Sequence, residues 1–329
     1  LIVAAPNGGE TWIVGASQNI TWTRPGSFAN VKLEYSRNGF LDELQTSLIS
    51  ASAPAAPLSF AWTIPDAIGT TVKVRASDAA DATVADTSNA NFTIKGSLAL
   101  TSPNGTEVWR VSESRNITWT KTGSIATVKL EYSTNGGTTF PNVITASTDA
   151  TTGTYAWTVP DAIGASLRVR ITNTADATVF DDSNANFEVK GQVTLTAPNG
   201  TEVWVVGSVQ TLTWTRTGTF ADVKLEYSTN AFANELQTTV ITLTTPADPL
   251  PTDNAGTYAW TVPDAIGTSL RVRITNTADA AVVDTSDANF KIVGSVTLTA
   301  PNGAESWTVG TAQNVTWTKV GSIANVKLE

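Results

Sequence analysis

Apolar and polar residues alternate along short stretches of this chain, and turn-forming residues separate the stretches about every 8 to 12 positions. No stretch keeps the helical period of about 3.6 residues. Alternate side chains of a strand point to opposite faces, so each stretch predicts one apolar and one polar face. Between residues 97 and 191 the apolar parity comprises Ile117, Trp119, Val128, Leu130, Tyr132, Tyr155, Trp157, Val159, Leu167, Val169, Ile171, Phe187 and Val189. The pattern predicts an all-β fold in which two sheets form a sandwich.

The tripeptide Pro-Asn-Gly recurs along the chain and reveals an internal repeat. Its copies begin at Pro6, Pro103, Pro198 and Pro301, at intervals of 97, 95 and 103 residues. We therefore expect three complete repeats, residues 1–96, 97–191 and 192–294, and a partial fourth, residues 295–329. The chain begins without Met and ends inside the recurring string VKLE, so we expect an internal piece of a longer polypeptide. Either that polypeptide contains the rest of the fourth repeat, which we favour, or another chain supplies the missing strands.

The order of the strings within a repeat favours an immunoglobulin-like strand order. In the second repeat, strand C carries VKLEYS and strand F carries LRVRI. Strand C lies beside strand F in such sandwiches. Glu131 is therefore predicted to lie near Arg168 or Arg170, as an exposed pair worth about 0–1 kcal/mol.

Successive repeats are joined by very short links. The last strand of one repeat passes almost directly into the first strand of the next, without a Pro- or Ser-rich spacer, at Lys95-Gly96, Lys190-Gly191 and Val293-Gly294. Short links limit bending between domains. The sequence therefore predicts tandem immunoglobulin-like β-sandwich domains forming a semi-rigid rod.

The eleven Trp residues all fall in three repeated columns. Aromatic residues on a sheet surface can bind sugars, whereas those that share parity with Ile, Val and Tyr belong to a core. We favour the core interpretation, most clearly for the second and third columns. The columns are Trp12, Trp109, Trp204 and Trp307; Trp22, Trp119, Trp214 and Trp317; and Trp62, Trp157 and Trp260.

Composition narrows the possible functions. The chain has no Cys, His or Met, which excludes disulfides, thiolate or imidazole zinc sites, and Cys or Ser–His nucleophiles. Paired carboxylates such as Glu107 and Glu131 could serve a glycosidase, but an enzyme rarely needs three identical sites in a row, so we expect no catalytic residues. A formal charge of −9 disfavours nucleic acid as a partner. No apolar run approaches the roughly 20 residues of a membrane span.

The loop between strands F and G is the one candidate metal site. Oxygen-bearing side chains recur there in aligned columns, and oxygen ligands suit Ca²⁺. The alternative is that Asp, Asn and Ser simply form and solvate the loop. Beyond this possible Ca²⁺ site, no cofactor is expected. The candidate ligands are Asp176, Asp181 and Asn184 in the second repeat, with equivalents Asp81, Asp86 and Asn89 in the first and Asp279, Asp284 and Asp287 in the third.

One string, PDAIG, occurs in all three complete repeats, within TYAWTVPDAIG at residues 154–164 and 257–267 and within SFAWTIPDAIG at residues 59–69. Its Pro and Gly predict the corner between strands E and F. We expect that corner to face the following repeat, so that its Ile packs towards an apolar residue there. The alternative is that each Ile closes the end of its own sandwich. The proposed interdomain pairs are Ile68 with Ile125, Ile163 with Phe220, and Ile266 with Ile323.

Six motifs follow one another in a fixed order in each complete repeat: P-N-G-x-E-x-W, G-x-x-x-x-I-T-W-T, V-K-L-E-Y-S, G-T-Y-A-W-T-V-P, R-V-R-I and S-x-A-N-F-x-[VI], with local variation. This order resembles the Ser/Thr-rich surface-protein domain of fungal GPI-anchored cell-wall proteins and of tandem repeats in secreted bacterial surface proteins. The resemblance implies an extracellular immunoglobulin-like sandwich with a structural or adhesive role. It brings no catalytic residues.

These observations favour a non-enzymatic extracellular or cell-surface structural protein, a segment or protomer of a filament, sheath or stalk. Its expected partners are neighbouring repeats and other copies of itself. Residues 153–187 and 256–290 are identical at 30 of 35 positions, which suits equivalent packing of every repeat. The alternatives are an adhesin or carbohydrate-binding array that recognises surface glycans, and a spacer in a secreted enzyme. The differing segments 40–58 and 232–250 favour the first alternative, because variable loops on a fixed scaffold carry recognition.

Overall fold

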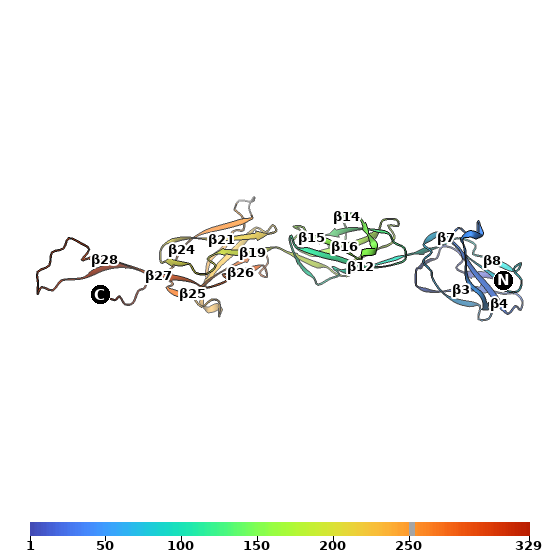
Figure 1. Cartoon of the computed structure of the whole chain (residues 1–329), viewed down its shortest axis with the longest axis horizontal. Coiled ribbons are helices and arrows are strands. Elements are labelled where there is room, and N and C mark those ends of the chain that lie inside the picture. The colour runs from blue at the N-terminus through green and yellow to red at the C-terminus, as the bar shows by residue number, and fades with distance from the viewer. Residues whose placement is uncertain (250–253) are drawn as a thin grey trace. The chain divides into compact units, whose positions relative to one another are not determined.

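The computed structural model describes residues 1–249 and 254–329 and consists of strands with a few single-turn 3₁₀-helices (Figure 1). Leu250, the last residue of the variable segment 232–250, lies outside the described residues. The all-β tandem architecture predicted from the alternating pattern is confirmed. The expected rod remains a prediction.

The first repeat follows the alternation strand by strand. The turns between strands contain Gly, Pro, Asn and Asp, as turn geometry favours. Its elements are β1 (Ile2–Ala5), β2 (Thr11–Ile13), β3 (Ser17–Thr23), β4 (Asn30–Ser36), η1 (Glu43–Gln45), β5 (Thr46–Pro54), β6 (Ser59–Thr63), β7 (Gly69–Asp78), β8 (Ala85–Thr87) and β9 (Phe92–Lys95).

The later repeats reproduce this order. The second has β10 (Ser97–Ser102), β11 (Val108–Arg110), β12 (Ser114–Thr122), β13 (Thr127–Ser133), β14 (Asn142–Asp149), η2 (Ala150–Thr152), β15 (Thr154–Thr158), β16 (Gly164–Asn173), β17 (Phe180–Asp182) and β18 (Phe187–Lys190). The third has β19 (Gln192–Ala197), β20 (Val203–Val205), β21 (Val209–Thr217), β22 (Asp222–Ser228), η3 (Glu235–Gln237), β23 (Thr238–Pro246), β24 (Ala255–Thr261), β25 (Gly267–Asn276), β26 (Val283–Thr285) and β27 (Phe290–Val293). Residues 295–329 contribute β28 (Ser295–Ala300) and β29 (Thr316–Val320), which pair with each other.

Each sandwich consists of a small and a large sheet. In the first repeat the small sheet has the order β1-β3-β6 and the large one β2-β9-β7-β4-β5, with β8 beside β7. The third repeat has the equivalent sheets β19-β21-β24 and β20-β27-β25-β22-β23, with β26 beside β25. Strands β4, β13 and β22 correspond to strand C, and β7, β16 and β25 to strand F. Strands β8 and β9, like β26 and β27, are two halves of strand G.

The PNGxE motif moves the chain from one sheet to the other. Pro6 ends β1 because proline cannot donate a ladder hydrogen bond. Glu10 then holds the turn, since its Oε1 accepts the N–H of Asn7 at 2.7 Å and its Oε2 that of Gly8 at 2.8 Å. As a result β2 runs parallel to β9 in the large sheet. The same Glu contacts recur at Glu107 and Glu202, so these carboxylates hold turns.

The Trp columns of the complete repeats lie in the sandwich cores, as predicted. Trp12 is 7% exposed and packs edge-on against Trp62, with ring centroids 6.0 Å apart. Trp22 is 2% exposed, and its Nε1–H donates to the carbonyl of Ala55 at 3.3 Å. A buried indole N–H needs such a partner. Trp119 and Trp214 donate equivalently, to Ala150 and Ala247. In the partial fourth repeat, Trp307 and Trp317 are exposed.

The predicted neighbourhood of strands C and F is confirmed. Strand β13 pairs antiparallel with β16, and Glu131 lies directly opposite Arg170. The same register places Glu34 opposite Arg75 and Glu226 opposite Arg273. All three pairs lie on the polar face of the large sheet.

The described chain divides into two compact units. One comprises Leu1–Glu107, Ser114–Trp157 and Gly164–Glu188, and the other Val108–Glu113, Thr158–Ile163 and Val189–Glu329. The boundary runs through the second repeat, so its PDAIG corner is grouped with the third repeat. Among the described residues, no helix is both long and apolar enough to cross a membrane.

Candidate functional site at the joints between repeats

Each joint brings the PDAIG corner of one repeat against the turn that precedes strand C in the next. At the first joint this turn contains Gly123, which has a positive φ of 84°. A Cβ on Gly123 would lie 3.1 Å from Cδ1 of Ile68, 3.2 Å from Cγ2 of Val14 and 3.3 Å from Oδ1 of Asp66. The corner therefore packs closely against the backbone of this turn, and a side chain on Gly123 would crowd it.

The same packing recurs at the other two joints. At the second, a Cβ on Gly218 would lie 3.0 Å from Cδ1 of Ile163 and 3.0 Å from Cγ2 of Val111. At the third, a Cβ on Gly321 would lie 3.1 Å from Cδ1 of Ile266 and 3.0 Å from Cγ2 of Val206. The three joints thus share one geometry.

The aspartate of the corner makes the principal polar contact across each joint. Oδ1 of Asp66 accepts the backbone N–H of Ser124 at 3.1 Å, and its Oδ2 accepts the Ser124 hydroxyl. Asp161 accepts the backbone N–H of Thr219 at 3.1 Å and its hydroxyl at 2.5 Å. Asp264 accepts the same two groups from Ser322, the N–H at 3.0 Å. Hydrogen bonds to a charged acceptor are stronger than those between neutral groups.

The apolar residue after this Ser or Thr covers the linking glycine. Cδ1 of Ile125 would lie 3.0 Å from a Cβ on Gly96, and Cδ1 of Phe220 2.9 Å from one on Gly191. Cδ1 of Ile323 would likewise lie 2.8 Å from a Cβ on Gly294. The corner Ile and the following apolar residue thus contact different glycines of one joint. Direct packing of Ile68, Ile163 and Ile266 on those residues stays a prediction.

Each of the first two joints is crossed by an ion pair. Nζ of Lys95, at the end of β9, lies 3.1 Å from Oδ2 of Asp176 in the following F–G loop. Nζ of Lys190 lies 3.0 Å from Oδ2 of Asp279. The third joint has Val293 at the position of the lysine. Lys95 and Asp176 also line a cavity of about 510 Å³ at the first joint, together with Ile68, Ser124 and Asn173.

Hydrogen bonds within the loops and across the joints lower the pKa values of three carboxyl groups at the joints. The hydrogen bond from the Thr178 hydroxyl, with smaller contributions from its N–H and from Lys95, lowers the pKa of Asp176 despite partial burial. Burial opposes ionisation of Asp279, but Lys190 and the N–H of Ala281 hold its pKa below the usual value. The hydroxyl and then the N–H of Ser322 lower the pKa of Asp264. All three groups are therefore anionic at neutral pH.

The calcium candidates of the F–G segment occupy three different structural positions. Asp81 and Asp176 cap their own loops by accepting the N–H of Thr83 and Thr178, each at 3.0 Å. The next column lies in the first half of strand G and holds the first strand: Asp86 accepts the N–H of Val3 at 2.8 Å, and Asp181 that of Leu100 at 2.7 Å. Asp284 likewise accepts the N–H of Leu195.

The third candidate column joins strand G to the PNG turn. The backbone N–H of Asn89, Asn184 and Asp287 donates, at 2.6 Å each, to the side chain of the Asn in that turn. Across residues 1–249 and 254–329, no group of three or more acidic residues is arranged to hold a metal ion. Calcium binding therefore stays a prediction, and the structure gives these residues other hydrogen-bond partners.

Sequence reasoning missed the two polar partners that hold the joints. From the sequence, the aspartate of PDAIG belongs only to a turn, and Lys95 only to the end of a link. The available signal was the Asp in all three copies of the string, together with a Gly-Ser or Gly-Thr pair at residues 123–124, 218–219 and 321–322.

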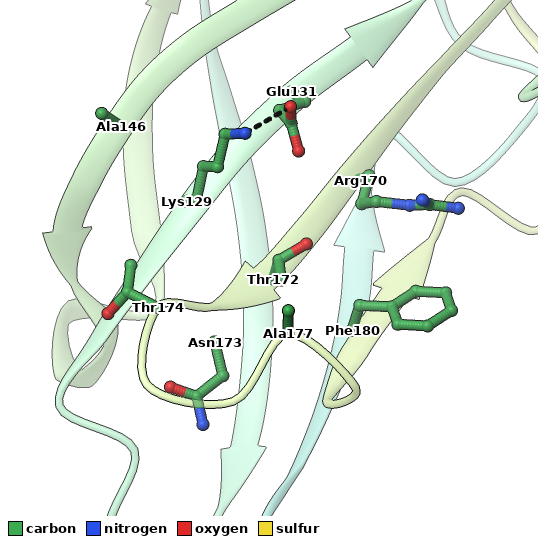
Figure 2. Close-up of a pocket in the computed structure, with 9 residues that line it drawn as sticks. All are labelled: Lys129, Glu131, Ala146, Arg170, Thr172, Asn173, Thr174, Ala177 and Phe180. Atoms are coloured by element: carbon green, nitrogen blue, oxygen red, sulfur yellow. Dashed lines mark ion pairs between the residues drawn. The ribbon is translucent and has the colours of Figure 1, made fainter. Parts of the chain in front are cut away.

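The second repeat also has an open pocket on the polar face of its large sheet (Figure 2). It has a volume of about 460 Å³ and is lined by Lys129, Glu131, Ala146, Arg170, Thr172, Asn173, Thr174, Ala177 and Phe180. Figure 2 shows Lys129 and Glu131 on strand β13, with Thr172 between them and Phe180. Nζ of Lys129 lies 2.6 Å from Oε1 of Glu131.

Neither a protein-family model nor a curated protein matches the chain. Similar solved structures include the fibronectin(III)-like modules of Clostridium thermocellum CbhA, 23% identical over 57% of this chain and 93% of that chain, with a TM-score of 0.22. A tetra-tandem repeat from the extending region of a large adhesion protein is 18% identical over 89% of this chain and 76% of that chain, with a TM-score of 0.30. The N-terminal four Ig domains of Dscam1 isoform 6.9 are 12% identical over 86% and 71%, with a TM-score of 0.30.

These similar structures are fibronectin(III)-like modules, a tetra-tandem repeat and four Ig domains. Their sequence identities and TM-scores are too low to support a conclusion about the function of this chain. The resemblance to the fungal Ser/Thr-rich domain stays a prediction, because no family model supports it.

Proposed function

We propose that this chain is a non-enzymatic segment of an extracellular surface array, a filament, sheath or stalk built from repeated sandwiches. The observation that carries the proposal is the repetition of one set of joint contacts at three successive joints. Each joint places a corner Ile against a glycine and gives the corner Asp two donors. A linker that only tethered domains would need none of these contacts.

The high identity of residues 153–187 and 256–290 supports the same function. These segments contain the corner aspartates Asp161 and Asp264 and the corner isoleucines Ile163 and Ile266, which contact the following repeat. Maintaining a sandwich requires only apolar side chains of suitable volume. Maintaining a joint between successive repeats also requires the corner Asp and Ile to recur, as they do in both segments.

The array is proposed to act through neighbouring repeats and other copies of itself. Electron microscopy of the native surface material tests this assembly. We expect ordered fibres or sheets in which successive sandwiches keep a constant relative orientation. Dispersed single chains with no regular contact between copies would contradict the proposal.

A solution experiment on the purified chain tests the joint itself. Residual dipolar couplings report the relative orientation of the second and third repeats and its fluctuation. We expect Asp161→Ala to widen the range of orientations, because the N–H and hydroxyl of Thr219 lose their acceptor. Asp42→Ala is the control: Asp42 caps η1, away from the joints. Equal couplings in the parent chain and both variants would show that the corner aspartate does not order the joint.

A further inference from the structure

The polar face of the large sheet differs between the second repeat and its neighbours. In the first repeat, Arg75 crosses this face: its Nη2 lies 3.0 Å from Oε2 of Glu34 and its Nη1 3.0 Å from Oε1 of Glu43. Its guanidinium also lies over the ring of Phe40, 4.5 Å from the centroid. Glu43 belongs to η1, in the connection between β4 and β5.

The third repeat repeats this arrangement. Arg273 bonds Glu226 at 3.0 Å and Glu235 of η3 at 2.9 Å, and stacks on Phe232 at 4.5 Å. In both repeats an arginine therefore lies between the glutamate of strand C and the 3₁₀-helix.

The corresponding arginine of the second repeat has different partners. Arg170 lies opposite Glu131 in the register, but its Nε and Nη2 bond the two carboxylate oxygens of Asp182 at 2.6 and 2.8 Å. Its guanidinium packs between two rings, 4.2 Å from the centroid of Phe140 and 4.6 Å from that of Phe180.

Three sequence differences cause this change. Asp182 stands where the other repeats have Thr87 and Thr285, and Phe180 where they have Ala85 and Val283. The connection from Ser133 to Asn142 contains no 3₁₀-helix in the described structure, so no glutamate equivalent to Glu43 reaches the arginine. A bidentate pair and two stacked rings hold Arg170 beside strand G, and the pocket of Figure 2 lies next to it.

The lining of this pocket favours an uncharged, hydroxylated ligand. Its charged groups are already paired, Lys129 with Glu131 and Arg170 with Asp182. A bound ion would have to compete with a pairing partner, whereas hydroxyl groups add hydrogen bonds without breaking a pair. Among the described residues, Oε2 of Glu131 has no arginine partner, although the equivalent oxygens of Glu34 and Glu226 do. A carboxylate oxygen readily accepts hydroxyl hydrogen bonds.

Phe180 supplies an apolar surface beside these polar groups. It is 49% exposed, which is unusual for a phenylalanine. An aromatic ring next to hydroxyl and carboxylate groups matches the two kinds of surface of a sugar ring, its C–H face and its hydroxyl edge. The pocket volume of about 460 Å³ lies within the range of small-molecule sites.

We propose that this pocket binds a neutral saccharide. The sugar ring lies against Phe180, and its hydroxyls donate to Glu131 and exchange hydrogen bonds with Thr172. The site belongs to the second repeat alone, because Phe180 and Asp182 have no counterparts in the first and third. Saccharide binding in this pocket does not require assembly of the array. A failure of the saccharide proposal is therefore distinguishable from a failure of the proposed array function.

Titration of the ¹⁵N-labelled full chain with neutral disaccharides tests the site. The probes are cellobiose, maltose and N,N′-diacetylchitobiose, added to about 50 mM because an open pocket gives weak binding. We expect at least one probe to produce saturable amide shifts confined to residues 129–131 and 170–180. Phe180→Ala, which introduces the residue of the first repeat, should weaken that binding about tenfold.

Matched variants separate the site from general effects. Phe232→Ala removes an arginine-stacked ring from the connection between β22 and η3 of the third repeat and should leave binding unchanged. Glu131→Gln replaces a carboxylate acceptor by an amide and should weaken binding severalfold. Absence of saturable shifts with all three probes would overturn the proposal. So would binding that Phe180→Ala leaves intact, or saturable binding of inorganic phosphate but of no sugar.

Discussion

Asp161, in the E–F corner of the second repeat, accepts two hydrogen bonds from Thr219 of the third, one from the backbone N–H at 3.1 Å and one from the hydroxyl at 2.5 Å. The same two bonds connect Asp66 to Ser124 and Asp264 to Ser322. A carboxylate with one backbone and one side-chain donor fixes both the distance and the direction of the turn it holds. The joint is therefore specified by residue identity as well as by the shortness of the link.

Removing the corner carboxylate should expose the amide that it holds. We expect Asp161→Ala to accelerate hydrogen exchange of the Thr219 amide about fivefold, since a net hydrogen bond contributes about 1 kcal/mol. The measurement is amide exchange by NMR on the full chain. Thr219→Ser should keep slow exchange, because serine serves at the other two joints. An unchanged Thr219 exchange rate in Asp161→Ala would contradict this assignment.

The ion pair at the first joint should contribute modestly and depend on salt. Asp176→Asn removes the charge that faces Lys95, and we expect a loss of about 0–1 kcal/mol at low ionic strength, because both groups are partly exposed. Asp81→Asn is the matched control: Asp81 caps its loop through Thr83 in the same way. The free energy of unfolding of the two variants is compared by denaturant unfolding at low salt and at about 1 M salt. At about 1 M salt the screening length is about 3 Å. A difference that persists at high salt would contradict an electrostatic origin.

Acid should loosen the third joint. The hydroxyl of Ser322, followed by its N–H, lowers the pKa of Asp264 below its ordinary value of about 3.9. A lowered pKa in the folded state means that this contribution is complete above about pH 4 and is lost as the pH falls through the lowered value. The amide shift of Ser322 followed by NMR from neutral to strongly acidic pH should report the transition. Asp264→Asn should abolish the pH dependence of the Ser322 amide shift. If the transition persists in this variant, another group causes it.

A side chain on the glycine of the joint turn should destabilise the first joint. Gly123 and Gly9 have nearly equal φ values of 84° and 83°. A Cβ on Gly9 would meet nothing within 4 Å, whereas one on Gly123 would crowd Ile68 and Val14. We expect Gly9→Ala to cost about 1–2 kcal/mol for the left-handed backbone alone, and Gly123→Ala to cost about 1–3 kcal/mol more because of crowding. Denaturant unfolding measures the free energy of unfolding of both variants. Equal losses of stability would show that the first joint accommodates the added methyl group without crowding.

Much of the architecture could be predicted because its determinants are local. The alternation of Val128, Leu130 and Tyr132 with Lys129 and Glu131 identifies a strand and its two faces. The strand order then predicts Glu131 near Arg168 or Arg170, and the register places it opposite Arg170. The side-chain pairing could not be predicted in this way. Arg170 pairs with Asp182, which competes with Glu131 from the opposite neighbouring strand, and sequence alone does not weigh two carboxylates against each other.

The F–G candidates show a similar limit. Asp86, Ser88 and Asn89 are close in sequence, and their oxygen atoms resemble a ligand set. In the fold, Asp86 accepts the N–H of Val3, Ser88 is buried and donates to the carbonyl of Pro6, and the N–H of Asn89 donates to Asn7. Asp86 lies in β8, whereas Ser88 and Asn89 follow that strand, so each residue meets a different partner from the N-terminal segment.

The sequence by itself determined the repeats, the strands, their buried faces and the position of the PDAIG corner, because hydrophobic periodicity and turn chemistry act over a few residues. Only the tertiary structure decided that Asp66 reaches Ser124, that Lys95 reaches Asp176, and that Arg170 turns from Glu131 to Asp182. Such pairings depend on which polar groups distant in sequence come within hydrogen-bonding distance, and packing between strands and repeats sets that distance.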